Sequence, residues 1–155
     1  MGGRAARFYG NFKNSLDAKG RVFIPAKFRE GLGTYFTLTK GFDACLVIYT
    51  MQDWETISEL LESIPSTDRE GREFKRHFFG NAIDCEMDKQ GRIGISQDLR
   101  EYARLTGDIG FIGMGKRIEL WNWENWKANN STYGDNAEVL SKAAQKYLAG
   151  KAAVL

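Results

Sequence analysis

The fold is decided by a stretch of sequence that occurs twice: Asp17-Ala-Lys-Gly-Arg-Val-Phe-Ile-Pro-Ala-Lys-Phe-Arg-Glu30 and, 71 residues later, Asp88-Lys-Gln-Gly-Arg-Ile-Gly-Ile-Ser-Gln-Asp-Leu-Arg-Glu101. The copies share Asp, Gly, Arg, Ile, Arg and Glu at the same places. Downstream, at a shift of 72, a second set of positions matches in order: Gly41, Leu46, Ile48, Tyr49 and Trp54 with Gly113, Ile118, Leu120, Trp121 and Trp126. The chain therefore holds two copies of one unit of about 47 residues.

A unit of this size buries too little apolar surface to be stable without a neighbour. We therefore expect two similar halves related by a pseudo-twofold axis, each covering the core of the other. The repeat divides the chain into five parts: an N-terminal extension (1–7), a first repeat (8–54), a helical linker (55–78), a second repeat (79–126), and a C-terminal loop and helix (127–155).

The turn chemistry at the start of each copy predicts a β-hairpin. Asp17 and Asp88 are Asx-turn formers, and Gly20 and Gly91 stand where a positive φ is needed. Alternating apolar residues follow each turn, as in a strand. A short helix beginning near Pro25 or Ser96 comes next, then two strands and a longer helix.

The linker predicts two helices. Apolar residues at three- and four-residue steps from Trp54 to Ile64 indicate an amphipathic helix that starts near Thr50 and stops at Pro65. Residues 66–70 resemble a capping box for a second helix through Phe78, with Gly80 as its C′ residue. Residues 127–135 are expected to be loop, and residues 136–151 a weak helix.

The composition is that of a soluble globular protein. Of 155 residues, 43% are hydrophobic and 27% charged, which excludes collagen, mucins and long disordered chains. No apolar run is long enough to span a membrane. Residues 1–40 have a net charge of +6, whereas residues 41–70 have −6. The basic part suits a polyanion and the acidic part a solvated helix or a self-association surface, the alternative being charge scattered for solubility.

Acid–base, nucleophilic and metal chemistry have little support. His77 is the only histidine, and it lies in a predicted helix where a packed histidine is expected. Cys45 and Cys85 stand alone, without the paired spacing that zinc requires, and are expected to be small core residues. With no signal-peptide pattern, they favour a reducing compartment. We expect no enzyme, no cofactor and no metal.

A glycine-rich segment imitates a phosphate-binding loop. Residues 110–116, Gly-Phe-Ile-Gly-Met-Gly-Lys, match the first seven positions of G-x-x-x-x-G-K-[ST]. The match ends at Arg117, which stands where a hydroxyl would hold magnesium, and a strand pattern follows instead of a helix. A tight turn between two strands is therefore the expected structure.

The D-x-x-G-R turns have two interpretations. Asp17 and Arg21, four residues apart, can form an ion pair that closes the turn, worth well under 1 kcal/mol at a surface. A turn that only has to close does not need arginine, however. Arg and Lys on a protruding tip reach phosphates and guanine edges, so DNA contact is the interpretation we favour.

These motifs resemble the MraZ family of bacterial transcriptional regulators, which belongs with the AbrB-like looped-hinge DNA-binding proteins. The resemblance covers residues 8–126 and rests on Phe8-Tyr-Gly-Asn, the motif from Ser15 to Arg29, Tyr49, Trp54, Phe79-Gly-Asn-Ala, the second motif from Asp88 to Arg92, Trp121 and Trp126. The two repeats differ at the start of the short helix, where position 96 is Ser and the first repeat has Pro25.

The resemblance implies an α+β, β-rich fold. Two tandem AbrB-like half-domains would form one pseudo-twofold double-split β-barrel with flanking helices. It also implies assembly of subunits into a ring and binding to double-stranded DNA at promoter repeats, usually those of the division and cell-wall gene cluster. A cytoplasmic, nucleoid-associated protein is expected. The alternative is an antitoxin-like interaction module on the same fold, which would need a partner-binding disordered tail, whereas residues 136–155 are weakly helical.

The family's DNA-contacting motif falls on both turns. The candidate DNA-binding residues are Lys13, Asp17, Lys19, Gly20, Arg21, Asp88, Lys89, Gly91 and Arg92. The turns differ in charge, since residues 13–29 have a net charge of +4 and residues 84–100 have −1. We therefore expect the first turn to contribute more to DNA binding than the second.

Overall fold

The computed structural model describes residues 6–149. The expected N-terminal extension therefore lies outside the described residues apart from Ala6 and Arg7, as does the expected end of the last helix. The strands are β1 (Asn11–Ser15), β2 (Arg21–Phe23), β3 (Tyr35–Lys40), β4 (Leu46–Thr50), β5 (Ile83–Glu86), β6 (Arg92–Gly94), β7 (Asp108–Gly113) and β8 (Arg117–Asn122). The helices are α1 (Ala26–Leu32), α2 (Met51–Glu62), α3 (Arg69–Phe79), α4 (Gln97–Tyr102), α5 (Trp123–Asn129), the π-helix η1 (Asn130–Gly134) and α6 (Ala137–Tyr147).

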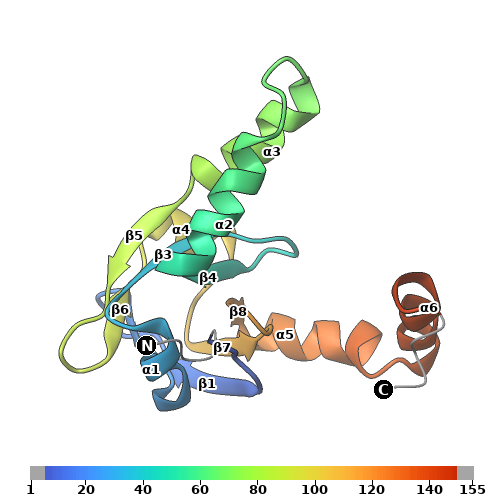
Figure 1. Ribbon diagram of the computed structural model, residues 1–155. Coiled ribbons are helices and arrows are strands. Elements are labelled where there is room, and N and C mark those ends of the chain that lie inside the picture. The colour runs from blue at the N-terminus through green and yellow to red at the C-terminus, as the bar shows by residue number, and fades with distance from the viewer. Residues whose placement is uncertain (1–5, 150–155) are drawn as a thin grey trace. The chain divides into compact units, whose positions relative to one another are not determined.

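The chain divides into two compact units, one up to Asn122 and one from Trp123 onward. The first unit holds all the strands of the described residues, in an antiparallel six-stranded sheet of order β1-β7-β8-β4-β3-β5 and a two-stranded ribbon of β2 and β6 (Figure 1). The fold is thus mixed α+β and rich in sheet. The described pairing leaves β1 and β5 as open edges, so it does not close the sheet into a barrel.

Strand pairing is unchanged when the two repeats are exchanged. The order of the six-stranded sheet then reads the same in reverse, and β2 and β6 swap places. At the centre of the ribbon Val22 pairs with Ile93, and between β4 and β8 the central pair is Val47 with Glu119. Four pairings join the repeats, β1 with β7, β3 with β5, β4 with β8 and β2 with β6. The halves are therefore interleaved.

The expected β-hairpins are wrong, although the turns form. β1 pairs with β7 and β2 with β6, so the strands on either side of the first turn belong to different sheets. The chain leaves β1 at Leu16, whose N–H donates to the carbonyl of Gly107 at 2.8 Å. The residues of each turn determine that the chain reverses its direction there. The partner of each strand is chosen by burial, since pairing β2 with β6 puts Val22 and Ile93 into one core.

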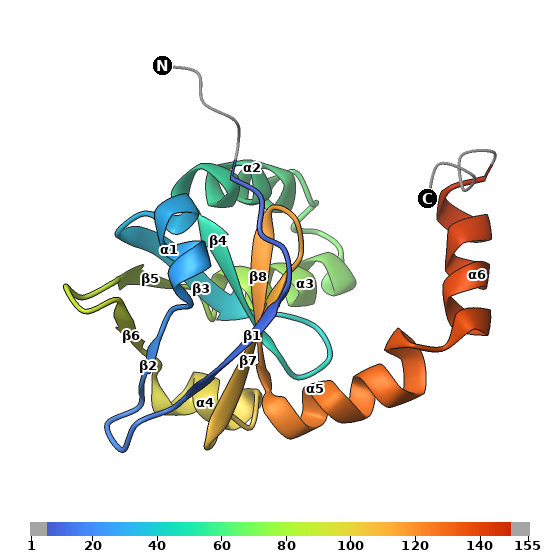
Figure 2. The same ribbon diagram turned by 90° about the horizontal axis from the view of Figure 1, so that it is seen from below.

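The six-stranded sheet is covered on both faces. On one side, Phe28 and Leu32 of α1 are buried, and so are Leu99 of α4 and Ala103 at its end, as the sequence predicts. They share one core with Val22 and Ile93 of the ribbon. Their core partners on the sheet are Phe36, Leu38, Leu46, Ile48, Ile109, Phe111, Ile118 and Leu120. Figure 2 shows α1 and α4 on this unit, with the two turns standing out from its left side.

The opposite face packs against the helical linker. The hydroxyl of Thr39, on β3, donates to the carbonyl of Phe78 in α3 at 2.7 Å. The ring of Trp54 in α2 lies against Tyr49 on one side and Phe79 on the other, with centroids 5.6 and 6.0 Å apart. The helices α2 and α3 form an antiparallel pair (Figure 1). The predicted linker helices are confirmed, with Thr50 as N-cap of α2.

Several helix ends differ from the expectations. Pro25 is the N-cap residue of α1 and not its first helical residue, while Ser96 occupies the N-cap of α4 without a side-chain hydrogen bond. Asp68, within the stretch expected to hold a capping box, caps α3 by accepting from the N–H of Gly71. Gly80 has a φ of −66° and not the expected left-handed conformation.

The second unit is more helical than expected. Residues 127–134 continue α5 into η1, so the predicted loop is wrong there. Asn and Ser disfavour helix only weakly, and no glycine or proline interrupts the chain until Gly134. The predicted last helix is present as α6, with the side chain of Asn136 accepting from the N–H groups of Glu138 and Val139.

Candidate nucleic-acid interface

Each D-x-x-G-R turn is closed by its own aspartate. Oδ1 of Asp17 accepts from the backbone N–H groups of Lys19 and Arg21, both at 2.9 Å, and Oδ2 accepts from Nε of Arg21 at 2.9 Å. The backbone completes the turn, because Asp17 N–H donates to the Arg21 carbonyl at 2.8 Å and Gly20 N–H donates to the Asp17 carbonyl at 3.1 Å. The ion pair expected from the local interpretation is therefore present.

The second turn repeats this arrangement. Asp88 accepts from the N–H groups of Gln90 and Arg92 through Oδ1 and from Nε of Arg92 through Oδ2, all at 2.9 Å. In both turns the hydrogen bond from the arginine side chain uses Nε. Among residues 6–149, neither guanidinium makes a further hydrogen bond through its Nη atoms. That end of the fork can bind a phosphate or a guanine edge.

The hydrogen bonds also lower the pKa of both turn carboxyls. For Asp17 the backbone N–H of Arg21 contributes most, with its guanidinium and the N–H of Lys19 acting in the same direction, so the pKa lies below its ordinary value of 3.8. The same groups of Arg92 and Gln90 lower the pKa of Asp88. Both carboxylates are therefore ionised at neutral pH, and both turns are closed.

Each turn is held by the other repeat. The N–H of Ile24 donates to the carbonyl of Gly91 at 2.8 Å, and the N–H of Ile95 donates to that of Gly20 at 2.9 Å. Gly20 and Gly91 have φ values of +77° and +88°, as predicted. An added Cβ at Gly20 would lie 3.0 Å from Cζ of Arg100, so the Arg100 side chain would have to shift to admit it. Hydrogen bonds between the repeats thus hold both turns against the ribbon.

The ribbon brings the two arginines onto one face. Val22 and Ile93 point into the core, so the residues on either side of them in β2 and β6 point outward. Arg21 lies opposite Gly94, and Phe23 lies opposite Arg92. From the strand spacing, the Cα atoms of Arg21 and Arg92 are roughly 8 Å apart. We call this outward face, made of Arg21, Phe23, Arg92 and Gly94, the ribbon face.

The predicted site residues fall into three groups. Asp17, Lys19, Gly20 and Arg21 form the first turn, and Asp88, Lys89, Gly91 and Arg92 form the second, with both lysines exposed. Lys13 is separate from them, because it lies on β1 in the six-stranded sheet, where its Nζ is 3.9 Å from a carboxylate oxygen of Asp108. The structure therefore joins the two arginines but not Lys13 to the ribbon face.

Phe23 is the residue of this surface that the sequence analysis missed. It is 43% exposed, and the Cζ of Arg92 lies 5.7 Å from the centre of its ring. The alternation of Val22 and Ile24 as buried residues already implies that Phe23 points outward. An aromatic residue at an outward position of the strand, two residues after Arg21, was the available signal.

The other candidate sites are structural. His77 donates from Nε2 to the carbonyl of Gly41 at 2.9 Å and stacks on Phe42. Burial raises the pKa of the Cys45 thiol well above its ordinary value and that of Cys85 to about 11, so both thiols are unreactive core groups. The glycine-rich segment is the turn between β7 and β8, with Gly115 at a φ of +82°.

Residues 6–149 offer neither a metal cluster nor a membrane-spanning helix. That part of the chain contains no group of three or more His, Cys, Asp or Glu side chains placed to hold an ion. It also contains no helix with the length and hydrophobicity needed to cross a bilayer.

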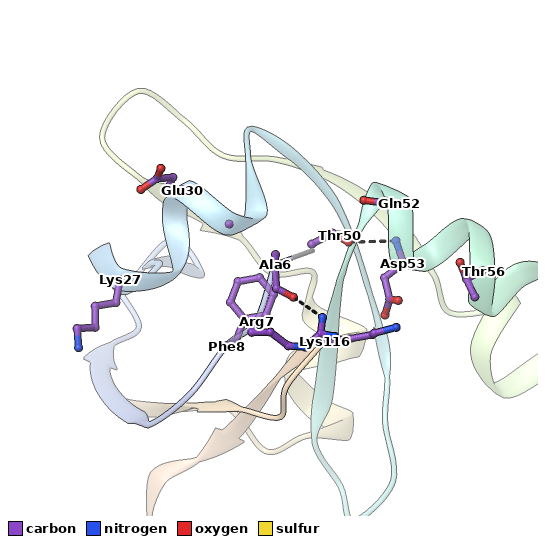
Figure 3. A pocket seen from close by; sticks show the side chains of 11 residues that line it. Ala6, Arg7, Phe8, Lys27, Glu30, Thr50, Gln52, Asp53, Thr56 and Lys116 are labelled. Atoms are coloured by element: carbon purple, nitrogen blue, oxygen red, sulfur yellow. Dashed lines mark hydrogen bonds between the residues drawn. The ribbon is translucent and has the colours of Figure 1, made fainter. Parts of the chain in front are cut away.

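A cleft of about 730 Å³ lies between α1, α2 and the β7–β8 turn (Figure 3). Its lining combines the cations Arg7, Lys27 and Lys116 with the carboxylates Glu30 and Asp53. Thr50 uses its hydroxyl to cap α2 here, accepting from the N–H of Asp53 at 3.0 Å. Such an open, mixed-charge surface suits contact with another protein surface better than capture of a small apolar ligand.

Comparison with known proteins agrees with the tandem architecture. The model of the MraZ protein family, described as antitoxin-like, matches the chain twice, at residues 8–77 and 78–148. A transcriptional regulator MraZ from Acetivibrio thermocellus is 47% identical over 135 residues, covering 87% of this chain and 94% of the relative. Proteins of the same name from Pelotomaculum thermopropionicum and Caldicellulosiruptor saccharolyticus are 49% and 47% identical, covering 86% and 88% of this chain and 94% of each relative. The chain belongs to the MraZ family.

Proposed function

We propose that this protein is a sequence-specific, DNA-binding transcriptional regulator that reads double-stranded DNA with the ribbon face and its two turns. The observation that carries the proposal is the placement of Arg21 and Arg92 on one outward face of a two-stranded ribbon. A ribbon of this width fits the major groove of B-DNA, where a guanidinium fork can bind O6 and N7 of guanine. Lys19 and Lys89, at the exposed turns, then contact phosphates on either side.

The target we propose is a set of promoter repeats, of the kind found at the division and cell-wall gene cluster. Relatives at 47–49% identity carry the name transcriptional regulator, which supports a role in transcription. The protein would then act in the cytoplasm, on the nucleoid. The interleaved sheet and ribbon would work as one double-split barrel that presents both turns to the same DNA segment.

We also propose that subunits assemble into a ring. The net charge of +6 on residues 1–40 and −6 on residues 41–70 favours contact between unlike faces of neighbouring copies, which closes a ring when the rotation permits. The exposed aromatic residues Phe42 and Phe74 and the mixed-charge cleft offer surface for such contacts. A ring would present several ribbon faces to tandem DNA repeats and gain affinity from multivalency.

The decisive test is a mobility-shift titration with two duplexes of equal length, one bearing tandem promoter repeats and the other a scrambled sequence. We expect tight binding to the first and at least 10³-fold weaker binding to the second, the usual ratio of specific to non-specific affinity. Equal binding to both duplexes would contradict sequence-specific recognition.

The same protein can be tested against the two other classes. An antitoxin-like module, which the family description suggests, would form a stoichiometric complex with a partner protein and show no preference for the repeats. An enzyme acting on nucleotides would shift on chromatography with ATP, whereas we expect a shift with promoter DNA and none with ATP. These outcomes separate the classes without an activity assay.

A further inference from the structure

The two arginines of the ribbon face are equivalent by the repeat but not by their surroundings. Both donate from Nε to their own aspartate at 2.9 Å. Arg92, however, stands opposite Phe23, and its Cζ lies 5.7 Å from the ring centre, whereas Arg21 stands opposite Gly94. The Arg92 side chain is accordingly 22% exposed and that of Arg21 36% exposed.

The backbone of Phe23, whose ring makes this difference, is held in place. The Phe23 carbonyl accepts a hydrogen bond from Nδ2 of Asn14 on β1 at 2.7 Å, which ties the end of β2 to the six-stranded sheet. The corresponding position in the second repeat is Cys85, a buried thiol that cannot make this bond. The backbone that carries the Phe23 ring is therefore fixed to the six-stranded sheet, below the Arg92 guanidinium.

A guanidinium within about 6 Å of an aromatic centre is attracted to the face of the ring. Together with the bond from Nε to Asp88, this contact restrains Arg92 at two points, whereas Arg21 is restrained at one, its bond to Asp17. Restraint before binding lowers the entropy lost when a side chain contacts its ligand. A restrained fork also tolerates fewer alternative partners, which is what base selectivity requires.

We propose that Phe23 is a positioning residue for DNA recognition, which holds the Arg92 guanidinium so that Arg92 selects a base while the less restrained Arg21 supplies mainly affinity. The proposal rests on the DNA-binding function proposed above. It makes the two turns different in kind: the first adapts to the backbone and neighbouring bases, and the second reads one defined base pair.

The first test does not use DNA. Nitrogen relaxation of the arginine Nε–Hε groups measures how rigid each guanidinium is, and we expect a higher order parameter for Arg92 than for Arg21. In Phe23→Leu, which keeps an apolar side chain but removes the ring, the value for Arg92 should fall to that of Arg21. In Phe23→Tyr it should stay high. Equal order parameters in the wild-type protein would overturn the positioning role.

The second test measures base selectivity, by selection of bound duplexes from a pool randomised at each position of one repeat. We expect Phe23→Leu to lose about tenfold in preference at a single base pair, with its salt dependence unchanged, and Phe23→Tyr to retain the preference. In an Arg92→Ala background, Phe23→Leu should have no further effect. A loss that persists there would mean that Phe23 acts through the fold or contacts DNA itself.

A matched exchange tests the idea in the opposite direction. A Cβ on Gly94 would meet no heavy atom within 4 Å outside its chain neighbours, so a side chain can start from this position, and Gly94→Phe carries a ring opposite Arg21. In the double variant Phe23→Gly/Gly94→Phe, we expect the high order parameter to move to Arg21 and the strong base preference to move to its contact. If the wild-type protein binds no DNA, the proposed function fails; if it binds and the exchange changes nothing, only the role of Phe23 fails.

Discussion

The guanidinium of Arg29 packs against the backbone of Gly91 so closely that a Cβ on that glycine would lie 2.5 Å from Cζ of the arginine. Arg29 belongs to the first repeat and Gly91 to the turn of the second, so this contact crosses between the halves. Its counterpart joins Arg100 and Gly20. Arg29 also donates from Nε to the carbonyl of Ile24 at 2.8 Å, which fixes the arginine against the ribbon.

This contact predicts that Gly91→Ala is destabilising. A φ of +88° strains alanine, and the added methyl group displaces Arg29, so we expect a loss of about 1–3 kcal/mol in the free energy of unfolding. Chemical denaturation followed by circular dichroism measures it. Gly94→Ala is the matched control, because its Cβ would lie in open space, and it should change stability by less than about 0.5 kcal/mol. Equal effects of both variants would contradict the packing argument.

The turn aspartates predict how stability changes in acid. Their pKa values are lowered in the folded protein, so the stabilisation is present above the ordinary value of 3.8 and is lost as the pH falls through the lower folded value. The double variant Asp17→Asn/Asp88→Asn lacks these groups and should lose less stability than the wild-type protein between pH 5 and pH 2. Unfolding curves of both proteins across this pH range measure the difference. If the two carboxylates did not contribute, both proteins would lose stability in parallel.

The charge around the two turns predicts unequal effects on DNA binding. We expect Arg21→Ala to lower the overall affinity for the repeats more than Arg92→Ala does, because the first turn is the more basic and the Arg21 side chain the more exposed. Each lost guanine contact costs about 1–3 kcal/mol. Titration of each variant by mobility shift measures the loss.

Arg76→Ala is the control for these two variants. Arg76 is an exposed arginine in a local ion pair, with Glu73 at 2.7 Å, but it lies on α3 and away from the ribbon. It should bind DNA as the wild-type protein does. All variants must first be shown to assemble normally. Equal losses in Arg21→Ala and Arg92→Ala, or a larger loss in the latter, would show that local charge does not decide which turn contributes more affinity.

Multivalent binding predicts a steep salt dependence. With, say, six phosphate contacts in total, the logarithm of the affinity should fall against the logarithm of the salt concentration with a slope of about −5. A duplex with three repeats should bind more tightly than one with a single repeat. Fluorescence anisotropy over a range of salt concentrations tests both points, and a flat titration or equal affinity for one and three repeats would refute them.

Assembly predicts a mass well above that of one chain. Light scattering at micromolar concentration and moderate salt should give a closed oligomer of defined size. Charge reversal of the acidic helix, for instance Asp53→Lys/Glu55→Lys, should weaken it, since α2 contributes much of the negative charge of residues 41–70. A stable wild-type monomer under these conditions would rule out the ring.

Local features of the fold could be predicted from the sequence, and non-local ones could not. The turns at Asp17 and Asp88, the buried stripe of Phe28 and Leu32, and the start of α2 at Thr50 all follow from chemistry within a few residues. The pairing of β1 with β7 does not, because β1 shows the same alternation whichever strand it joins. That choice depends on burial across the two repeats.

The candidate site divides in the same way. The spacing of the motif identifies the aspartate and the arginine of each turn. These are Asp17 and Arg21 in the first turn and Asp88 and Arg92 in the second. It does not show that Phe23 stands opposite Arg92, since this depends on the register of β2 against β6, which are 69 residues or more apart in sequence. The sequences of the two turns therefore show that the turns differ in charge. They do not show that an aromatic ring lies opposite only one of the two arginines.

The interleaved pairing of the two repeats affects how the protein folds and how it stays folded. A chain carrying one repeat would have to obtain its missing strands from a second copy, and its folding would then depend on concentration. The linker of α2 and α3 acts as a tether that replaces this encounter with an intramolecular one at a high effective concentration. The ribbon face should therefore survive dilution, whereas a nick in the segment between Glu62 and Arg69 would leave two fragments able to complement each other.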